Sequence, residues 1–228
     1  MRTMQLIALG SLVSLTSMSL AGPGGGCSLC AGEPSVQAAA GLDQAMIDTL
    51  VAMREEEKLA RDVYLTLGEK WDEPAFGIAE SEKRHLEAMK GLLDRFGIED
   101  PIKDDTRGVF TSERYAKLYA QLIERGSVSR VEALRVGALI EELDLTDLRQ
   151  ALAQAEDESI ERVLGNLQRA TRNHLRAFAA ALKAQGAAYE SQYLTQDEFD
   201  SIAGSPRERG GMGGGQGNRQ GSGRSMGG

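Results

Sequence analysis

The chain has 228 residues, of which 41% are hydrophobic and 5% aromatic, and it contains five prolines and two cysteines. This composition suits one helical domain with polar ends, and the sequence has no sustained two-residue alternation typical of strands. The net charge of −8 is uneven: residues 1–21 carry +1 and residues 204–228 carry +3, which leaves −12 for residues 22–203. So acidic a domain disfavours nucleic acid as a partner and favours cations.

Residues 1–21 have the pattern of a secretory signal peptide. Arg2 supplies the positive start, an apolar run follows at 6–15, and small residues at 19–21 suit a cleavage site. A membrane anchor is the alternative, but the apolar run is short and Gly10 interrupts it. No later segment is long and apolar enough to cross a bilayer. We therefore expect an exported protein, periplasmic or extracellular.

Two further segments of low complexity flank the predicted domain. Residues 22–41 form a small-residue linker that contains Cys27 and Cys30, and residues 204–228 form a Gly- and Arg-rich tail that we expect to be disordered. A CxxC pair can form a disulfide, a redox pair or half of a metal site. No second pair completes a zinc site, and Ala31 replaces the histidine of a haem attachment motif. In an oxidising compartment a local disulfide is the expected state, and lipid attachment at Cys27 is an alternative.

Residues 42–203 contain four segments in which apolar residues recur every three to four positions, which predicts an all-α domain. The predicted helices span about 42–67, 73–96, 129–155 and 158–184. The connection at 98–127 holds a predicted short helix at 115–123. It is long enough to return the chain to the other end of a bundle, which allows a parallel crossover. A short amphipathic segment near 195–202 is predicted to cap one end.

Five polar residues interrupt the apolar stripes near the middle of these helices: Glu57, Glu82, His85, Glu141 and His174. The spacing Glu82-x-x-His85 places a carboxylate and an imidazole on one helix face. Burying an uncompensated carboxylate costs roughly several kcal/mol, so three on core stripes need partners. A divalent metal would compensate all five residues at once. The alternative is a metal-free buried network with nearby arginines: Arg54, Arg61, Arg84 and Arg172.

At these residues the chain resembles the ferritin-like carboxylate-bridged diiron proteins, and most closely the family known as domain of unknown function 2202. The segments that carry the resemblance are 54–64, 78–85, 136–144 and 173–178. The resemblance implies a ferritin-like four-helix bundle with a long crossover between its second and third helices. It also implies two divalent metal ions, iron or manganese. Their terminal carboxylate ligands would be Glu57 and Glu141, their bridging ligand Glu82, and their nitrogen ligands His85 and His174.

The chain departs from the ferritin-like pattern at one position. Three residues before His174 stands Thr171, where the pattern has a glutamate. One bridging carboxylate is therefore missing, and occupancy by a single metal becomes an alternative. A water, another anion or a nearby acidic residue could take its place: Asp62, Glu142 or Asp144. Tyr64 could hydrogen-bond a ligand or relay an electron, or simply belong to the core.

These observations predict an exported metal-binding protein that could react with oxygen or peroxide, for example as a ferroxidase. Metal storage without turnover and a metal-free helical interaction protein of the cell envelope are the alternatives. Ferritin-like domains often pair, so a homodimer is an expectation from the resemblance. The sequence names no substrate, because it contains neither a nucleotide-binding glycine loop nor a convincing Ser-His-Asp set.

Overall fold

The computed structural model describes residues 41–209, and over this range the chain is helical, without strands. The predicted all-α class is therefore confirmed. The predicted signal peptide, the CxxC linker and the tail beyond residue 209 lie outside the described residues. The helices are α1 (Gln44–Trp71), η1 (Pro74–Ile78), α2 (Ala79–Phe96), α3 (Glu113–Gly126), α4 (Arg130–Gln154), α5 (Glu158–Ala184) and α6 (Gln196–Gly204).

Local sequence signals set most of these helix ends. Ser129 is the N-cap of α4, as predicted, and its hydroxyl accepts a 3.1 Å hydrogen bond from the backbone N–H of Glu132. Thr195 and Glu198 form a capping box at the start of α6. Helix α5 begins and ends at the predicted residues. Local capping chemistry therefore accounts for the starts of α4 and α6 without reference to tertiary contacts.

The end of α1 and the start of α2 differ from the prediction. Helix α1 continues past Gly68 to Trp71 and ends where Asp72 adopts a left-handed conformation, with φ of 46°. Gly68 instead permits close packing, because a Cβ there would lie 2.9 Å from Cβ of Phe76. Residues 74–78 form a separate 3₁₀ turn before α2 rather than its first turn. The glycine marks a contact between η1 and α1, which the sequence pattern does not distinguish from a helix stop.

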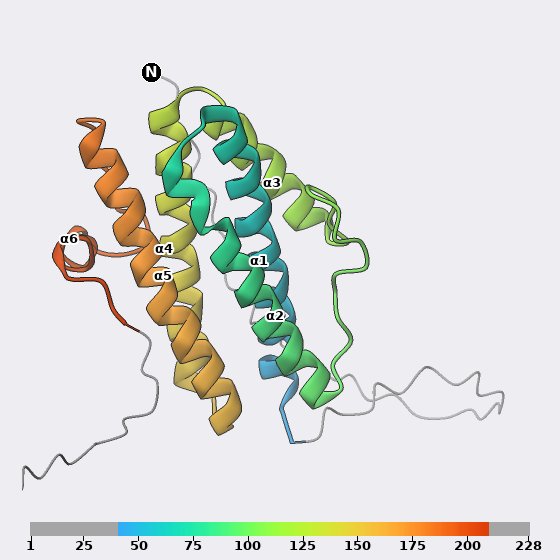
Figure 1. The fold of residues 1–228 in the computed structure, drawn as a ribbon. Coiled ribbons are helices and arrows are strands. Elements are labelled where there is room, and N and C mark those ends of the chain that lie inside the picture. The colour runs from blue at the N-terminus through green and yellow to red at the C-terminus, as the bar shows by residue number, and fades with distance from the viewer. Residues whose placement is uncertain (1–40, 210–228) are drawn as a thin grey trace, which may run out of the picture.

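The four long helices pack side by side. Helix α1 contacts α2 and α4, and α5 also contacts α2 and α4. In Figure 1, α1 and α5 run upward whereas α2 and α4 run downward. The connection that contains α3 packs on α1 and α4 and returns the chain to the end where α2 began. The second and third long helices are consequently parallel.

The apolar core divides into two clusters along these helices. One contains Met53 of α1, Met89 of α2 and Leu167 of α5; the other contains Leu59, Ala79 and Leu175 of the same helices. Between the clusters, each helix carries polar residues instead. A layer of buried polar side chains therefore crosses the middle of the helix assembly, with apolar packing on both sides.

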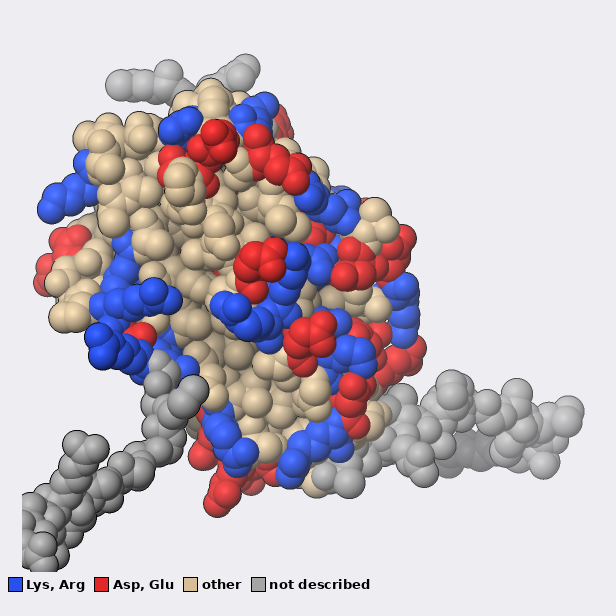
Figure 2. Space-filling model, viewed as in Figure 1, with Lys and Arg blue, Asp and Glu red and all other residues tan. Residues whose placement is uncertain are grey.

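The long connection is fastened to α1 by ion pairs. Arg54 binds Asp100 through two nitrogens, at 3.2 and 3.0 Å, and Arg61 binds Asp105 at 2.8 Å. On the face drawn in Figure 2, basic and acidic side chains lie interspersed around an uncharged central band. Within residues 41–209, none of the helices has the length and apolarity needed to cross a membrane.

Candidate metal centre

The polar layer contains all five predicted site residues, and four helices supply them. Glu57 comes from α1, Glu82 and His85 from α2, Glu141 from α4 and His174 from α5; none is more than 7% exposed. They form two groups, Glu57–Glu82–His85 and Glu82–Glu141–His174. In each group, one ligand atom per residue lies within 4.8 Å of the others. The structure therefore brings together all five residues, and the two groups share Glu82.

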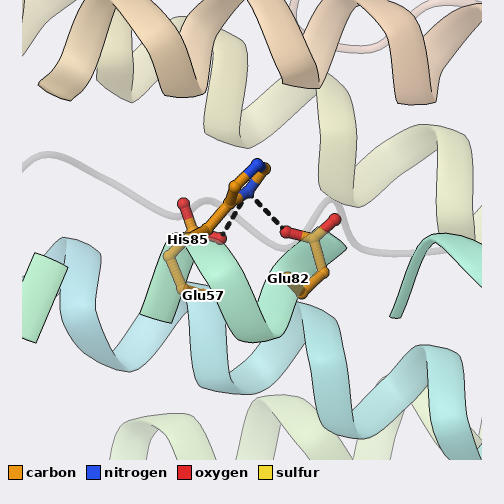
Figure 3. Close-up of side chains that lie close together, drawn as sticks. All are labelled: Glu57, Glu82 and His85. Carbon is orange, nitrogen blue, oxygen red and sulfur yellow. Dashed lines mark hydrogen bonds and ion pairs between the residues drawn. The ribbon is translucent and has the colours of Figure 1, made fainter. Parts of the chain in front are cut away.

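The carboxylate of Glu82 lies between the two imidazoles. Its Oε2 is 2.7 Å from Nδ1 of His85, and its Oε1 is 2.9 Å from Nδ1 of His174. Figure 3 shows His85 reaching both Glu82 and Glu57, whose Oε2 lies 3.3 Å from Nδ1 of His85. The two imidazole rings are stacked, with centroids 5.4 Å apart. Each Glu82 oxygen thus faces a different histidine.

Three buried side-chain atoms in the layer that could bind a metal have no hydrogen-bond partner among the described residues. They are Oε1 of Glu57, Oε1 of Glu82 and Nδ1 of His174. Oε1 of Glu82 and Nδ1 of His174 form a 2.9 Å ion pair when His174 is protonated, so among the described residues Oε1 of Glu57 alone has neither kind of partner. Leaving a buried polar atom unpaired costs about 1–3 kcal/mol, and more for a charged group. A divalent cation would satisfy these atoms, and carboxylate oxygen with imidazole nitrogen is a donor set that suits iron or manganese.

The arginines that could have neutralised these carboxylates pair elsewhere. Arg54 binds Asp100, and Arg61 binds Asp62 and Asp105. Arg172 binds Glu208 beyond the end of α6. A buried Glu–His–Arg network, the metal-free alternative, therefore lacks three of its four candidate arginines.

In the absence of a cation, protons on the two imidazoles offset part of the carboxylate charge. Burial alone would lower the pKa of His85, but the charges of Glu57 and Glu82 outweigh it and raise that pKa to about 11. Burial likewise opposes the charges of Glu82 and Glu141, which raise the pKa of His174 to about 10. Burial raises the pKa of Glu57 to about 7. The surrounding carboxylates therefore favour positive charge on both imidazoles.

Tyr64 contacts a candidate ligand, as the sequence suggested. Its hydroxyl donates a 2.5 Å hydrogen bond to Oε1 of Glu141. Burial and the charge of Glu141 raise the pKa of Tyr64 well above its ordinary value, so the phenol remains a donor. The ring also packs against Phe76 and Phe178, at centroid distances of 5.8 and 5.3 Å. Tyr64 is both a core residue and a support for Glu141.

Two of the three acidic residues considered for the missing carboxylate are engaged elsewhere. Asp62 accepts hydrogen bonds from Lys58 Nζ at 2.5 Å, Arg61 Nε at 2.8 Å and the Gly108 backbone N–H at 2.9 Å, which fastens the long connection. Glu142 accepts from the segment after α5, namely from Tyr189, Ser191, Gln192 and Leu194. Neither carboxylate is available to a centre between α2 and α5.

The third residue, Asp144, lies at the centre. It stands one helical turn after Glu141 on α4, and its Oδ2 is 2.5 Å from the hydroxyl oxygen of Thr171. Burial raises the pKa of Asp144 well above its ordinary value, and the charges of Glu57 and Glu141 raise it further. Of the three candidates, Asp144 alone contacts the position where the pattern lacks a glutamate.

A cavity of about 30 Å³ opens onto these carboxylates between α1, α3 and α4. That volume holds roughly two water-sized molecules. Its walls include Glu57, Glu82, Glu141 and Asp144, together with the half-buried Glu56 and Asp147. The sequence pattern left open whether Glu56 supports the ligands or lies on the surface, and it did not single out Asp147, because both residues lie off the apolar stripes that identified the others.

Residues 46–206 match the model of a family described as "Uncharacterized protein domain (DUF2202)". The chain belongs to this family. The DUF2202 match spans every residue of the candidate centre, and it confirms the predicted membership of the DUF2202 family. The chain is 48% identical over 162 residues to the uncharacterized protein MJ0754 of Methanocaldococcus jannaschii, covering 71% of this chain and 88% of the relative.

A solved structure of this relative has the same fold. The crystal structure of hypothetical protein MJ0754 from Methanococcus jannaschii superposes with a TM-score of 0.71 at 42% sequence identity. The comparison covers 79% of this chain and 100% of that chain.

Proposed function

We propose that this DUF2202 protein is a ferritin-like protein that binds two divalent cations, iron or manganese, in the polar layer between its helices. The observation that carries the proposal is the sharing of Glu82, which turns one oxygen toward each histidine within two overlapping ligand groups. The ligands come from four long helices of which the second and third are parallel. Carboxylate-bridged centres of ferritin-like proteins have this arrangement.

The residues divide naturally between two ions. Glu57 and His85 would hold one, Glu141 and His174 the other, and Glu82 both. Iron bound in this way would supply redox chemistry toward oxygen or peroxide. The adjoining cavity is large enough for a molecule the size of oxygen or peroxide. Tyr64 fixes the orientation of Glu141. The apolar clusters on both sides of the layer limit the access of bulk water.

We also propose that the protein is exported, on the basis of residues 1–21 alone. Their charged start, short apolar run and small residues at the end have the pattern of a cleaved signal. Cell fractionation of the full chain, with the N-terminal sequence of the mature protein, tests this. A cytoplasmic product that retains Arg2 would contradict it.

A metal-free role in protein interaction is the second candidate, since protonated His85 and His174 can balance two carboxylates without a cation. Among the described residues, the buried Oε1 of Glu57 has neither a hydrogen-bond nor an ion-pair partner, and this unpaired oxygen favours the metal site over this candidate.

Metal analysis of untagged protein after anaerobic loading with Fe(II) separates these functions. We expect two ions per chain, abolished by Glu82→Ala. Glu80→Ala is the matched control on the same helix, because Glu80 is exposed and forms an ion pair with Lys83 at the surface. Wild-type protein that retains well under one ion per chain would exclude both metal functions. If the Fe(II)-loaded protein consumes neither oxygen nor peroxide, redox turnover is excluded and metal storage is the function that remains.

A further inference from the structure

The two histidine helices differ at one equivalent position. On α2, Glu82 precedes His85 by three residues, and on α5 the same spacing places Thr171 before His174. Thr171 is 0% exposed, and its hydroxyl also lies 3.1 Å from the Leu167 carbonyl of its own helix. The α5 side of the centre therefore presents a short hydroxyl where α2 presents a carboxylate.

A carboxylate from the neighbouring helix lies against that hydroxyl. Asp144 and Glu141 are three residues apart on α4, so their side chains share a helix face. Asp144 contacts Thr171 and lines the same cavity as Glu57, Glu82 and Glu141. Glu57 and Glu141, which belong to different ligand groups, exert the strongest charge effects on it. Asp144 thus borders the cavity onto which carboxylates of both ligand groups open.

The charge balance of the centre gives Asp144 a role. Two divalent cations with neutral imidazoles carry four positive charges, whereas Glu57, Glu82 and Glu141 supply three negative ones. Asp144 supplies the fourth. Without cations, four carboxylates this close together repel one another, and burial makes their ionisation still less favourable.

We propose that Asp144 is a sixth protein ligand of the metal centre, supplied by α4 in place of the carboxylate missing at position 171. The proposal rests on the proposed function, because it assigns a ligand to the same centre. It predicts that the chain keeps two tight cation sites despite Thr171. The competing explanation is structural: Asp144 would only join α4 to α5 through Thr171.

Titration of the metal-free full chain with Co(II), followed by equilibrium dialysis and visible absorbance, tests the proposal. We expect two ions in the wild type and at least about tenfold weaker binding of one ion in Asp144→Asn. Asp147→Asn is the matched control, since Asp147 is one turn further along α4 and lines the same cavity. Thr171→Ala removes the hydroxyl contact but keeps the carboxylate, so it should retain both ions.

Thermal unfolding of the metal-free variants separates a ligand from a structural contact. Asparagine keeps an oxygen that can accept from Thr171 and lacks a carboxyl group whose ionisation is unfavourable in this buried acidic cluster, so Asp144→Asn should leave the Tm unchanged or raised while its Co(II) binding weakens. A structural role would lower the Tm and would make Thr171→Ala behave like Asp144→Asn, which would overturn the proposal.

A rescue variant tests whether a carboxylate at position 171 can replace the carboxylate at position 144 as a ligand. In Asp144→Asn with Thr171→Glu, the carboxylate returns from α5, and we expect binding of the second ion to recover. If the double variant has wild-type circular dichroism but does not recover binding of the second ion, Asp144 does not take the place of a carboxylate at position 171. Wild-type Co(II) affinity in Asp144→Asn would overturn Asp144 as a ligand and leave the proposed function intact. Absence of Co(II) binding in the wild type would instead defeat the proposed function itself.

Discussion

Tyr64 on α1 donates a hydrogen bond to Glu141 on α4, which lies 77 residues later in the chain, and the two oxygen atoms are 2.5 Å apart. The contact occupies Oε1 of Glu141. The other oxygen, Oε2, lies 3.5 Å from Nδ1 of His174. Tyr64 therefore fixes which Glu141 oxygen faces the second histidine, and it ties this candidate ligand to the aromatic packing of the core.

Replacing Tyr64 with phenylalanine should weaken the binding of one cation and spare the other. The ring packing remains, but Glu141 loses its orienting donor, and loss of such a partner typically costs about 10–100-fold in metal affinity. Calorimetric titration with Mn(II) measures this. Tyr119→Phe is the control, since it loses a 2.8 Å contact with Thr66 away from the centre. Equal affinities in both variants would contradict the role given to Tyr64.

Single histidine variants should reveal two distinguishable ions. His85 belongs to the group with Glu57, and His174 to the group with Glu141. We expect His85→Ala and His174→Ala each to reduce the bound metal from two ions to one, as measured by elemental analysis after dialysis. Loss of both ions in each variant would show that the two groups do not bind independently. The variant Glu82→Ala provides the comparison, because Glu82 is shared.

Cation binding should release protons and strengthen as the pH rises. Without metal, His85 and His174 have pKa values raised to about 11 and about 10, so both rings are protonated at neutral pH. Each ion must displace one of these protons, which makes its affinity rise up to about tenfold per pH unit. Calorimetry in buffers of different ionisation enthalpy counts the released protons. Binding without proton release at pH 7 would contradict the charge balance of the centre.

The raised pKa values of His85 and His174 also make the metal-free protein less stable as the pH rises, whereas cation binding becomes stronger. Because the folded pKa values exceed the unfolded value of about 6.5, the imidazolium groups stabilise the fold fully below that pH. The contribution is lost as the pH rises toward about 10 for His174. Urea unfolding between pH 6 and pH 10 should therefore show a declining histidine contribution, which is absent in the variant that lacks both histidines.

Gly137 should be a sensitive position in the core beside the centre. A Cβ at this residue of α4 would lie 2.3 Å from two ring atoms of Phe178, which packs against Tyr64. We expect Gly137→Ala to lower the free energy of unfolding by about 1–3 kcal/mol. Gly91→Ala on α2 is the control, since the exposed site is open and helix propensity favours alanine by about 1 kcal/mol. Similar effects in urea unfolding would rule out the steric cause.

The sequence by itself determined the helices and most of the candidate centre. Helix periodicity and caps such as Ser129 act over a few residues, so they can be read without the fold. Glu57, Glu82 and His174 were visible because a polar residue on an apolar stripe must be buried with a partner. The two exceptions, at Gly68 and at residues 74–78, occur where η1 packs on α1, which is a tertiary contact.

Only the tertiary structure decided what surrounds those ligands. Asp62, Glu142 and Asp144 are equivalent in the sequence as sources of a carboxylate. In the structure, however, the segments packed on α1 and α4 donate hydrogen bonds to Asp62 and Glu142. Asp144 faces Thr171, and Tyr64 meets Glu141, because α4 has one particular rotation against α1 and α5. Residues three positions apart share a helix face, but which helix that face meets depends on packing between residues far apart in the chain.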